Sequence, residues 1–299
     1  MNIVLLGDMP APEWTLWRAA LAAAMPEAHW FDADAAAAVP ETIEAAVVAN
    51  PPPGSLRPYP GLRLVQSLWA GVDRLLVDKT IPPTLPLARM VDPAMNAAMA
   101  ETALWATLSL HRGFFAYARR QREGRWHAHA QRRADEVGVL VLGQGQMGRT
   151  AAERIAQQGY RVEGWRRSAA LAPLLARSDI VVNLLPLTAE TSGLLNADFF
   201  ATLPPKAAIV NLGRGGHVVD ADLLAALDSG RLRHAVLDVF HTEPLPPGHA
   251  FWAHPRVTML PHAAAQTDPR SAAQVAAANL RAVRDGRPIE HLVDRARGY

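Results

Sequence analysis

The chain has 299 residues, enough for about two domains that each bury a core of their own. It contains no cysteine, which excludes disulfides, thiolate nucleophiles and Cys-ligated zinc. Half of the residues are hydrophobic, and 30 basic side chains against 28 acidic ones leave a formal net charge of +2. This balance argues against extended disorder and against a strongly basic surface for nucleic acid.

The sequence predicts neither a membrane span nor a signal peptide. No stretch reaches the roughly 20 consecutive apolar residues that a span requires. The opening segment, MNIVLLGDMP, lacks a basic region and meets Asp8 too early for a signal peptide. We therefore expect a soluble, cytoplasmic protein.

Short runs rich in Val, Ile and Leu alternate along the chain with longer segments of helical period, a pattern typical of parallel strands connected by helices. Two series of strands are predicted, which indicates an α/β fold with two sheets. The first series comprises residues 3–6, 46–49, 63–66 and 87–89. The second comprises residues 137–142, 162–165, 180–184, 208–211, 235–239 and 257–260.

Two long segments are predicted to be helical. Residues 94–122 form an unbroken stretch without proline that would carry the chain from one domain to the other. Residues 270–285 form another, and because no strand follows it, this last helix is expected to return to the first domain. The alanine-rich residues 33–38 predict a short helix, and the proline-rich residues 51–60 predict a surface loop.

The segment VGVLVLGQGQMGRTAAERIAQQG places Gly143, Gly145 and Gly148 between an apolar strand and a helix that begins near Gln146. This is the GxGxxG pattern in the context that dinucleotide binding requires. The first glycine permits a tight turn, the second lets backbone N–H groups approach a pyrophosphate, and the third allows close packing of helix on strand. Glycines also serve ordinary turns, but the strand before and the helix after favour a dinucleotide site.

Three polar residues, Arg214, Glu243 and His262, each follow a predicted strand of the second series. Parallel strands end at one edge of a sheet, and ligands bind outside those ends, so the three side chains are expected to converge. Taken singly, Arg214 could be a surface arginine, Glu243 a turn residue before Pro244, and His262 the N-cap of the segment after it. Together, beside a dinucleotide loop, they are the groups that reduction of a 2-keto acid requires.

A resemblance to the D-2-hydroxyacid dehydrogenase family is carried by the segments GQGQMG, NLLPLTAET, NLGRGGHVVDADLLAALDSGRL, LDVFHTEPLP and HPRVTMLPHAAA. The closing VDRARGY is similar to the glyoxylate/hydroxypyruvate reductase A branch. The resemblance covers about residue 64 to the C-terminus. It implies two Rossmann-like domains with a cleft between them, and a homodimer built through the cofactor domain. The expected boundaries are residues 1–97 with 270–299 for the substrate-binding domain and 98–269 for the dinucleotide-binding domain.

The resemblance also implies a role for each site residue. Arg214 would bind the substrate carboxylate, His262 would act as acid and base, and Glu243 would orient His262. In the segment SLWAGVD, a substrate loop would be formed by Trp69, Ala70 and Gly71, with the N–H groups of the last two cradling the carboxylate. Asp238 would contact the nicotinamide carboxamide. The other residues expected at the cofactor are Gly143, Gln144, Gly145, Gln146, Met147, Gly148, Arg166, Arg167, Ser168, Leu185, Pro186, Thr191, Leu212, Gly213, His262 and Ala264.

These roles form a coherent chemistry. The guanidinium of Arg214 is a planar fork that matches a carboxylate and would orient the keto group. Glu243 beside His262 favours the imidazolium, so the ring can donate a proton to the carbonyl oxygen while hydride arrives at carbon. The hydride itself comes from the cofactor, which the protein positions. We therefore expect an NAD(P)H-dependent reductase of small 2-keto acids such as glyoxylate or hydroxypyruvate.

One segment departs from the family pattern. Residues 166–179 are too few for the usual helix, strand and helix, so the third strand of the cofactor domain is expected to be missing or vestigial. The strand RVEGW ends in Arg166, Arg167 and Ser168, where an NAD-preferring fold carries an acidic residue. The only nearby acid, Glu163, lies inside the strand. Two guanidiniums and a hydroxyl suit a 2′-phosphate, so NADP(H) is expected to be preferred over NAD(H).

Other interpretations remain open. A D-lactate- or D-glycerate-type dehydrogenase would differ only in pocket shape, and a dinucleotide-sensing module without catalysis would use the same fold. His127 and His129 in RWHAHA could suggest a metal pair, but no third ligand is evident nearby and a solvated loop is favoured. Trp69 could line the substrate pocket or simply pack.

Overall fold

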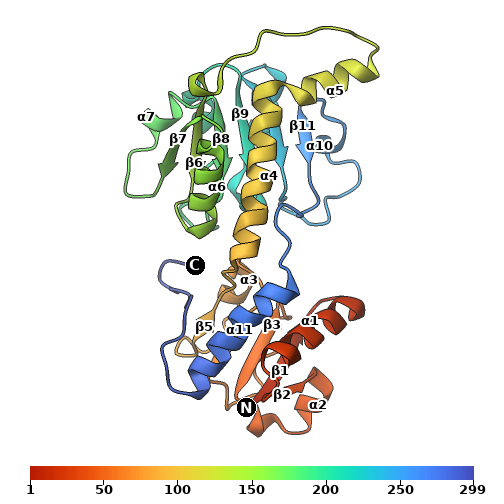
Figure 1. The fold of residues 1–299 in the computed structure, drawn as a ribbon, viewed down its shortest axis with the longest axis vertical. Helices are drawn as coiled ribbons and strands as arrows, with labels where there is room; N and C mark the ends of the chain where they lie inside the picture. Colours follow the sequence, from red (N-terminus) through yellow and green to blue (C-terminus); the bar gives the residue numbers. More distant parts are fainter. The chain divides into compact units, whose positions relative to one another are not determined.

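The computed structural model describes residues 1–299, and the chain separates into two compact units. Unit 1 comprises Met1–Met95 and Thr267–Tyr299, and unit 2 comprises Asn96–Gln266. Both ends of the chain therefore belong to unit 1. The predicted α/β fold with two parallel sheets is confirmed (Figure 1).

Unit 1 contains a five-stranded parallel sheet in the order β2-β1-β3-β4-β5. Its strands are β1 (Asn2–Gly7), β2 (His29–Phe31), β3 (Ala45–Ala49), β4 (Leu64–Ser67) and β5 (Leu87–Ala88). The sequence predicts four of them and misses β2. This strand is a three-residue edge strand with the sequence HWF, so it lacks the run of aliphatic residues that identifies the others.

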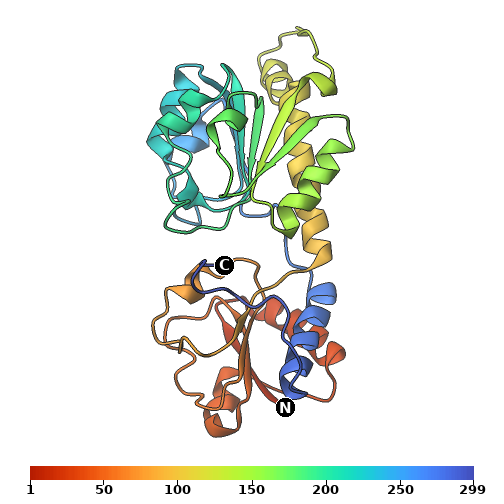
Figure 2. The ribbon, with the colours of Figure 1, turned by 90° about the vertical axis from the view of Figure 1, so that its left-hand side faces the viewer.

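Helices cover both faces of the unit 1 sheet. One face carries α1 (Ala11–Ala24) and α11 (Pro269–Arg284), which pack against each other (Figures 1 and 2). The other face is covered by α2 (Ala33–Ala37) and α3 (Asp73–Leu76), with η1 (Pro40–Thr42) beside them. Helix α11 buries the side chains of Ala272, Ala276, Leu280 and Val283, spaced so that they share one stripe of the helix. The predicted return of the last helix to the first domain is thereby confirmed.

Unit 2 contains a six-stranded parallel sheet in the order β11-β10-β9-β8-β6-β7. Its strands are β6 (Gly138–Leu142), β7 (Arg161–Trp165), β8 (Ile180–Asn183), β9 (Ala207–Asn211), β10 (Leu232–Leu237) and β11 (Val257–Met259). Strand β7 is an edge strand, and after α7 (Ala172–Leu175) the chain returns directly to β8 on the other side of β6. The expected loss of the third strand is therefore confirmed.

The sheet of unit 2 lies between two layers of helices (Figure 2). On one face pack α4 (Pro93–Arg112) and α6 (Gln146–Ala156), and on the other α7, α8 (Ala197–Thr202), α9 (Asp220–Asp228) and α10 (Ala250–Ala253). The remaining elements are α5 (Phe114–Arg122), η2 (Ala134–Glu136) and η3 (Gly215–His217). No helix combines the length and the apolar composition needed to cross a membrane.

The predicted unbroken helix over residues 94–122 is wrong. Gly113 adopts a φ of +75°, in the left-handed region, and divides the segment into α4 and α5. A glycine populates this region at little cost, and the helical period alone does not reveal that the backbone turns there.

Candidate active site

The turn between β6 and α6 has the geometry that its three glycines predict. At Gly143 φ is +98°, and an added Cβ would lie 2.7 Å from the carbonyl oxygen of Leu184. At Gly148 an added Cβ would collide with the carbonyl oxygen of Gly143, so helix and turn pack closely. At Gly145, the N-cap of α6, an added Cβ would meet nothing within 4 Å. The helix N-terminus thus faces open space, and this arrangement fits the pyrophosphate of a dinucleotide.

The side chains of Gln144, Gln146 and Met147 in this turn all contact other residues of unit 2. Nε2 of Gln144 donates to the carbonyl oxygens of Val141 and Gly143 at 3.3 and 3.2 Å. Oε1 of Gln146 accepts a hydrogen bond of 3.4 Å from Nδ2 of Asn96, a buried residue of α4 that sequence reasoning did not select. Met147 is partly buried against α4 and the sheet.

Three polar residues follow the end of β7. Arg166, Arg167 and Ser168 are exposed, and a turn forms in which Ala169 N–H donates to the carbonyl of Arg166. The guanidinium of Arg167 lies 3.3 Å from Thr188 Oγ1 and 3.7 Å from Glu190 Oε2. The side chain of Arg166 makes no hydrogen bond or ion pair within the chain.

The nearby acid inside β7 is already paired. The carboxylate of Glu163 accepts two hydrogen bonds of 2.6 Å from the guanidinium of Arg177, and this pairing holds the pKa of Glu163 below its usual range. Glu163 is therefore engaged along the strand rather than at its end.

The loop after β8 carries Leu185, Pro186 and Thr191 of the predicted cofactor set. Leu185 is buried, and Thr191 is buried with its hydroxyl donating to the carbonyl oxygen of Pro186 at 2.8 Å. The same hydroxyl accepts a hydrogen bond from Thr188 N–H. The hydroxyl of Thr191 thus stabilises the loop after β8 by bonding two backbone groups of that loop.

Leu212, Gly213 and Arg214 follow β9. Leu212 is buried in the core, and Gly213 lies so close to the β8 loop that an added Cβ would be 3.0 Å from the carbonyl oxygen of Leu185. Arg214 donates from Nη1 to the carbonyl of Gly213 at 2.8 Å, and its backbone begins η3. Arg214 therefore stands at the carboxyl end of β9, at the edge of the sheet where the glycine turn also lies.

The structure brings Glu243 and His262 together. His262 Nδ1 lies 2.7 Å from Glu243 Oε2, and Oε1 of the same carboxylate accepts a hydrogen bond of 2.8 Å from the N–H of Phe240. The two residues follow β10 and β11, which are neighbours in the sheet, and Arg214 follows β9 beside them. The predicted N-cap alternative for His262 is not what the structure shows, because the following helix α11 is capped by Asp268.

Asp238 holds the backbone of the histidine loop. His262 has a φ of +53°, which is uncommon for a residue with a side chain, and its N–H donates to the carbonyl of Asp238 at 2.9 Å. The Asp238 carboxylate accepts hydrogen bonds from the N–H groups of Ala263 and Ala264 at 2.7 and 3.1 Å. Burial raises the pKa of Asp238, while those two backbone hydrogen bonds lower it.

The predicted substrate loop lies in unit 1, directly after β4. Trp69 N–H donates to Ser67 Oγ at 3.0 Å, and the Trp69 carbonyl accepts a hydrogen bond of 3.0 Å from Met90 N–H. The ring of Trp69 packs edge-on against the buried Trp17, with 6.2 Å between centroids. Ala70 and Gly71 are partly exposed. Trp69 therefore has a packing partner, and its pocket role stays a prediction.

The two histidines of the segment RWHAHA contact residues of α5. The ring of His129 stacks on Tyr117 with 4.8 Å between centroids, and its Nε2 lies 3.3 Å from Nε2 of Gln131. The carbonyl of His127 accepts a hydrogen bond from Arg120. The contacts of His129 use its ring, whereas the contact of His127 uses its backbone carbonyl.

Sequence reasoning missed a buried polar cluster behind Arg214, formed by Asn183, Asn211 and His217. A signal for it is present in the sequence. The strands β8 and β9 both end at an asparagine that a leucine follows, and the two asparagines are register partners in the parallel sheet. Two buried amides at one level of adjacent strands need hydrogen-bond partners from the loops after those strands.

Comparisons with known proteins agree with this architecture. Residues 104–264 match the model of the D-isomer specific 2-hydroxyacid dehydrogenase NAD-binding domain. A glyoxylate/hydroxypyruvate reductase A of Klebsiella pneumoniae is 39% identical, with 85% of this chain and 87% of the relative covered. The crystal structure of a D-isomer specific 2-hydroxyacid dehydrogenase from Xanthobacter autotrophicus Py2, in complex with NADPH and MES, has a TM-score of 0.93 at 39% identity, covering 100% of this chain and 99% of that one.

A second solved structure is an NADPH-dependent glyoxylate/hydroxypyruvate reductase from Sinorhizobium meliloti in complex with NADP and sulfate. Its TM-score is 0.92 at 34% identity, and the alignment covers 100% of this chain and 99% of that chain. The chain therefore belongs to the D-isomer specific 2-hydroxyacid dehydrogenase family. It is an NAD(P)-dependent oxidoreductase, and the predicted resemblance to the glyoxylate/hydroxypyruvate reductase A branch is confirmed.

Proposed function

We propose that this enzyme reduces glyoxylate and hydroxypyruvate to the corresponding 2-hydroxy acids and that NADPH is its preferred hydride donor. The names of the relatives support this choice of substrate and cofactor. The observation that carries the proposal is the 2.7 Å contact between His262 Nδ1 and Glu243 Oε2 at the sheet edge that also bears the glycine turn. A module that only senses a dinucleotide has no need of such a proton donor.

The cofactor, when bound, supplies the hydride. Its pyrophosphate would be held by the backbone N–H groups at the start of α6, next to Gly145, where the backbone faces open space. Arg166 is the residue best suited to a 2′-phosphate, because its guanidinium has no partner within the chain, whereas Arg167 already contacts Thr188 and Glu190.

His262 would supply the proton to the carbonyl oxygen. Because Glu243 occupies the Nδ1 side of the ring, Nε2 is the nitrogen left to carry a proton toward the substrate. The carboxylate of Glu243 sets the orientation of the ring, since its other oxygen is anchored on Phe240 N–H. The main-chain hydrogen bond from His262 to Asp238 holds the backbone that carries the ring.

Arg214 would bind the carboxylate of the keto acid through two parallel hydrogen bonds. The substrate-binding role of Ala70 and Gly71, which the family resemblance implies, stays a prediction. No observation favours the D-lactate- or D-glycerate-type alternative.

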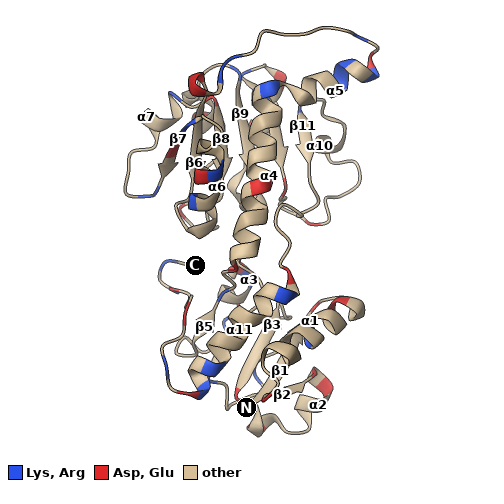
Figure 3. Ribbon diagram, viewed as in Figure 1, with Lys and Arg blue, Asp and Glu red and all other residues tan.

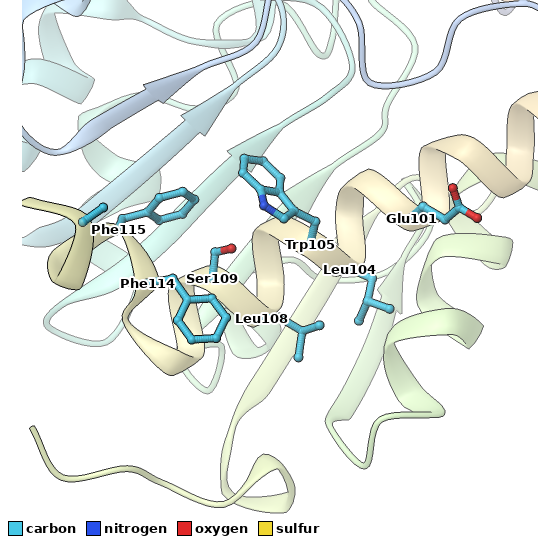
Figure 4. A pocket seen from close by; sticks show the side chains of 8 residues that line it. Glu101, Leu104, Trp105, Leu108, Ser109, Phe114 and Phe115 are labelled. Carbon is cyan, nitrogen blue, oxygen red and sulfur yellow. The ribbon is translucent and has the colours of Figure 1, made fainter. Parts of the chain in front are cut away.

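We also infer a homodimer formed through unit 2. Figure 4 shows an apolar surface on α4 and α5 lined by Leu104, Trp105, Leu108, Phe114 and Phe115. Trp105 is 40% exposed and Phe114 is 53% exposed, although both are large apolar side chains. Helix α4 carries only two charged residues along its length, Glu101 and Arg112 (Figure 3). Exposed apolar patches of this kind are typical of protein interfaces.

Sedimentation tests the dimer. The parent should sediment as a dimer, and Trp105→Glu should sediment as a monomer because a charge would be buried at the interface. The matched control is Trp252→Glu, which alters another exposed tryptophan on α10. A parent monomer, or a dimer unaffected by Trp105→Glu, would contradict the inference. The expected place of the enzyme in the cytoplasm stays a prediction.

The proposed activity is tested by a panel of 2-keto acids assayed with NADPH and with NADH, followed at 340 nm. The highest kcat/KM should be found for glyoxylate or hydroxypyruvate with NADPH. A preference for pyruvate would instead favour a D-lactate-type enzyme. Absence of turnover with every keto acid would rule the proposal out.

A further inference from the structure

His217 is a fully buried histidine, 0% exposed, that connects two loops of the site in unit 2. Its Nδ1 lies 3.1 Å from the backbone nitrogen of Arg214 and 2.9 Å from Nδ2 of Asn183. Its Nε2 lies 3.2 Å from the carbonyl oxygen of Pro186. A backbone N–H can only donate and a carbonyl can only accept, so these partners assign the neutral ring with its hydrogen on Nε2.

The backbone of Arg214 is held on both sides by this cluster. Its N–H donates to His217, and its carbonyl accepts a hydrogen bond of 3.0 Å from Nδ2 of Asn211. The amides of Asn183 and Asn211 join at 2.9 Å across the register of β8 and β9. Oδ1 of Asn183 accepts the N–H of Leu185 at 3.2 Å, which orients the amide so that its nitrogen faces His217.

The cluster lies directly behind residues that the proposed function uses. An added Cβ on Gly213 would be 3.1 Å from Nδ2 of Asn183 and 3.2 Å from Cε1 of His217, so the β9 loop lies tightly against the cluster. The Pro186 carbonyl, which His217 contacts, also accepts the hydroxyl of Thr191. One imidazole therefore links the loop expected at the cofactor to the loop that bears Arg214.

We propose that His217 is a positioning residue for the reduction, through Nδ1 for Arg214 and through Nε2 for the Pro186 loop. The inference rests on the proposed role of Arg214 in binding the substrate carboxylate. A bidentate contact tolerates little displacement, and misplacing a reacting group by about 1 Å can cost roughly a hundredfold in rate. An apolar side chain in place of His217 would leave a buried N–H and a buried carbonyl without their partner.

Two conservative variants separate the two contacts. His217→Asn keeps an acceptor near the place of Nδ1 but loses the donor to Pro186. His217→Gln keeps a donor near the place of Nε2 but loses the acceptor for Arg214 N–H. Loss of one hydrogen bond of about 1 kcal/mol corresponds to roughly a fivefold change in affinity.

The measurements are kcat and KM for glyoxylate at saturating NADPH and the dissociation constant of NADPH. His217→Gln should raise KM for glyoxylate roughly fivefold or more and leave NADPH affinity near that of the parent. His217→Asn should weaken NADPH binding by a similar factor and leave KM for glyoxylate near that of the parent. If His217 had only a structural role, both variants would be less stable, but neither would change KM for glyoxylate and the dissociation constant of NADPH selectively.

His234→Gln is the matched control, because His234 is a partly buried histidine of unit 2 that bonds Thr258 rather than a site loop. It should leave both constants unchanged. The inference is overturned if both His217 variants keep the parent's constants, or if both change the two constants alike. Should neither variant fold, Asn211→Ala removes the other hydrogen bond to Arg214, and it should raise KM for glyoxylate; an unchanged KM would overturn the inference.

Arg214→Gln separates this inference from the proposed function. If Arg214→Gln leaves KM for glyoxylate unchanged, the proposed role of Arg214 fails. If Arg214→Gln raises that KM while His217→Gln does not, the role of Arg214 stands and only the inference about His217 fails.

Discussion

His262 Nδ1 lies 2.7 Å from Glu243 Oε2, and the other oxygen of that carboxylate is bound to the N–H of Phe240. The carboxylate thus connects the loop after β10 to the imidazole in the loop after β11. Because the contact uses Nδ1, it leaves Nε2 as the nitrogen that can transfer a proton. A histidine oriented by a carboxylate in this way is suited to general acid catalysis.

Glu243→Ala should lower kcat for glyoxylate roughly tenfold or more, because His262 loses the carboxylate that orients its ring through Nδ1. Glu243→Gln should lower kcat less, because the amide oxygen can still accept a hydrogen bond from Nδ1. Steady-state rates of the two variants check this. A kcat of Glu243→Ala equal to that of the parent would show that Glu243 does not orient His262.

Arg214→Lys should lower kcat/KM for glyoxylate roughly tenfold to a hundredfold, since losing a charge-assisted bidentate contact costs about 1.5 to 3 kcal/mol. Lysine keeps the positive charge but not the planar fork, so the keto acid would be held loosely. NADPH affinity should stay near that of the parent. Parent-like activity in Arg214→Lys would mean that only a positive field is needed.

Arg166→Asp should lower kcat/KM for NADPH at least about tenfold and spare NADH, because a charge-assisted contact to the 2′-phosphate would be replaced by repulsion. Arg154→Asp makes the same charge change at an exposed position in the last turn of α6 and should not alter the preference. Equal use of both cofactors by the parent, or an unchanged preference in Arg166→Asp, would count against the phosphate site.

His234 should make unit 2 less stable in acid. Burial lowers its pKa from 6.5 to about 4, with Arg233 adding to the effect. The folded state therefore favours the neutral ring, and this contribution is complete above pH 6.5 and is lost as the pH falls from 6.5 toward 4. At a pH of about 4.5 the loss amounts to roughly 2.5 kcal/mol of unfolding free energy.

Denaturant unfolding at neutral pH and at a pH of about 4.5 tests this contribution. His234→Gln cannot titrate, so its unfolding free energy should fall less between the two pH values than that of the parent. His29→Gln changes an exposed histidine of β2 and should fall as the parent does. Equal acid sensitivity of the parent and His234→Gln would contradict the burial effect.

The sequence predicts the fold and the edge of the sheet where the site lies, because both follow from local patterns. Aliphatic runs identify all six strands of unit 2, and the polar residues after β9, β10 and β11 must share one edge in a parallel sheet. The short segment after Arg166 suffices to predict the absent third strand. The edge strand β2 is not predicted, because its three residues include no aliphatic run.

Contacts between distant residues could not be predicted in this way. The acceptor for Arg214 N–H is a ring three residues later, and the orientation of that ring depends on Asn183 at the end of β8 and Pro186 in the loop after it. The turn at Gly113 depends on a single left-handed residue within a segment of strong helical period. Arg166 and Arg167 look equivalent in sequence, and only the contacts of Arg167 with Thr188 and Glu190 distinguish them.

The proposed reaction requires that His262 donate the proton while glyoxylate is reduced by NADPH. The parent and His262→Ala are compared for glyoxylate-dependent NADPH oxidation and for NADPH binding. His262→Ala should bind NADPH as the parent does but lose about 10²- to 10⁴-fold in kcat, the usual contribution of general acid catalysis. A kcat near that of the parent, with NADPH still bound, would contradict it.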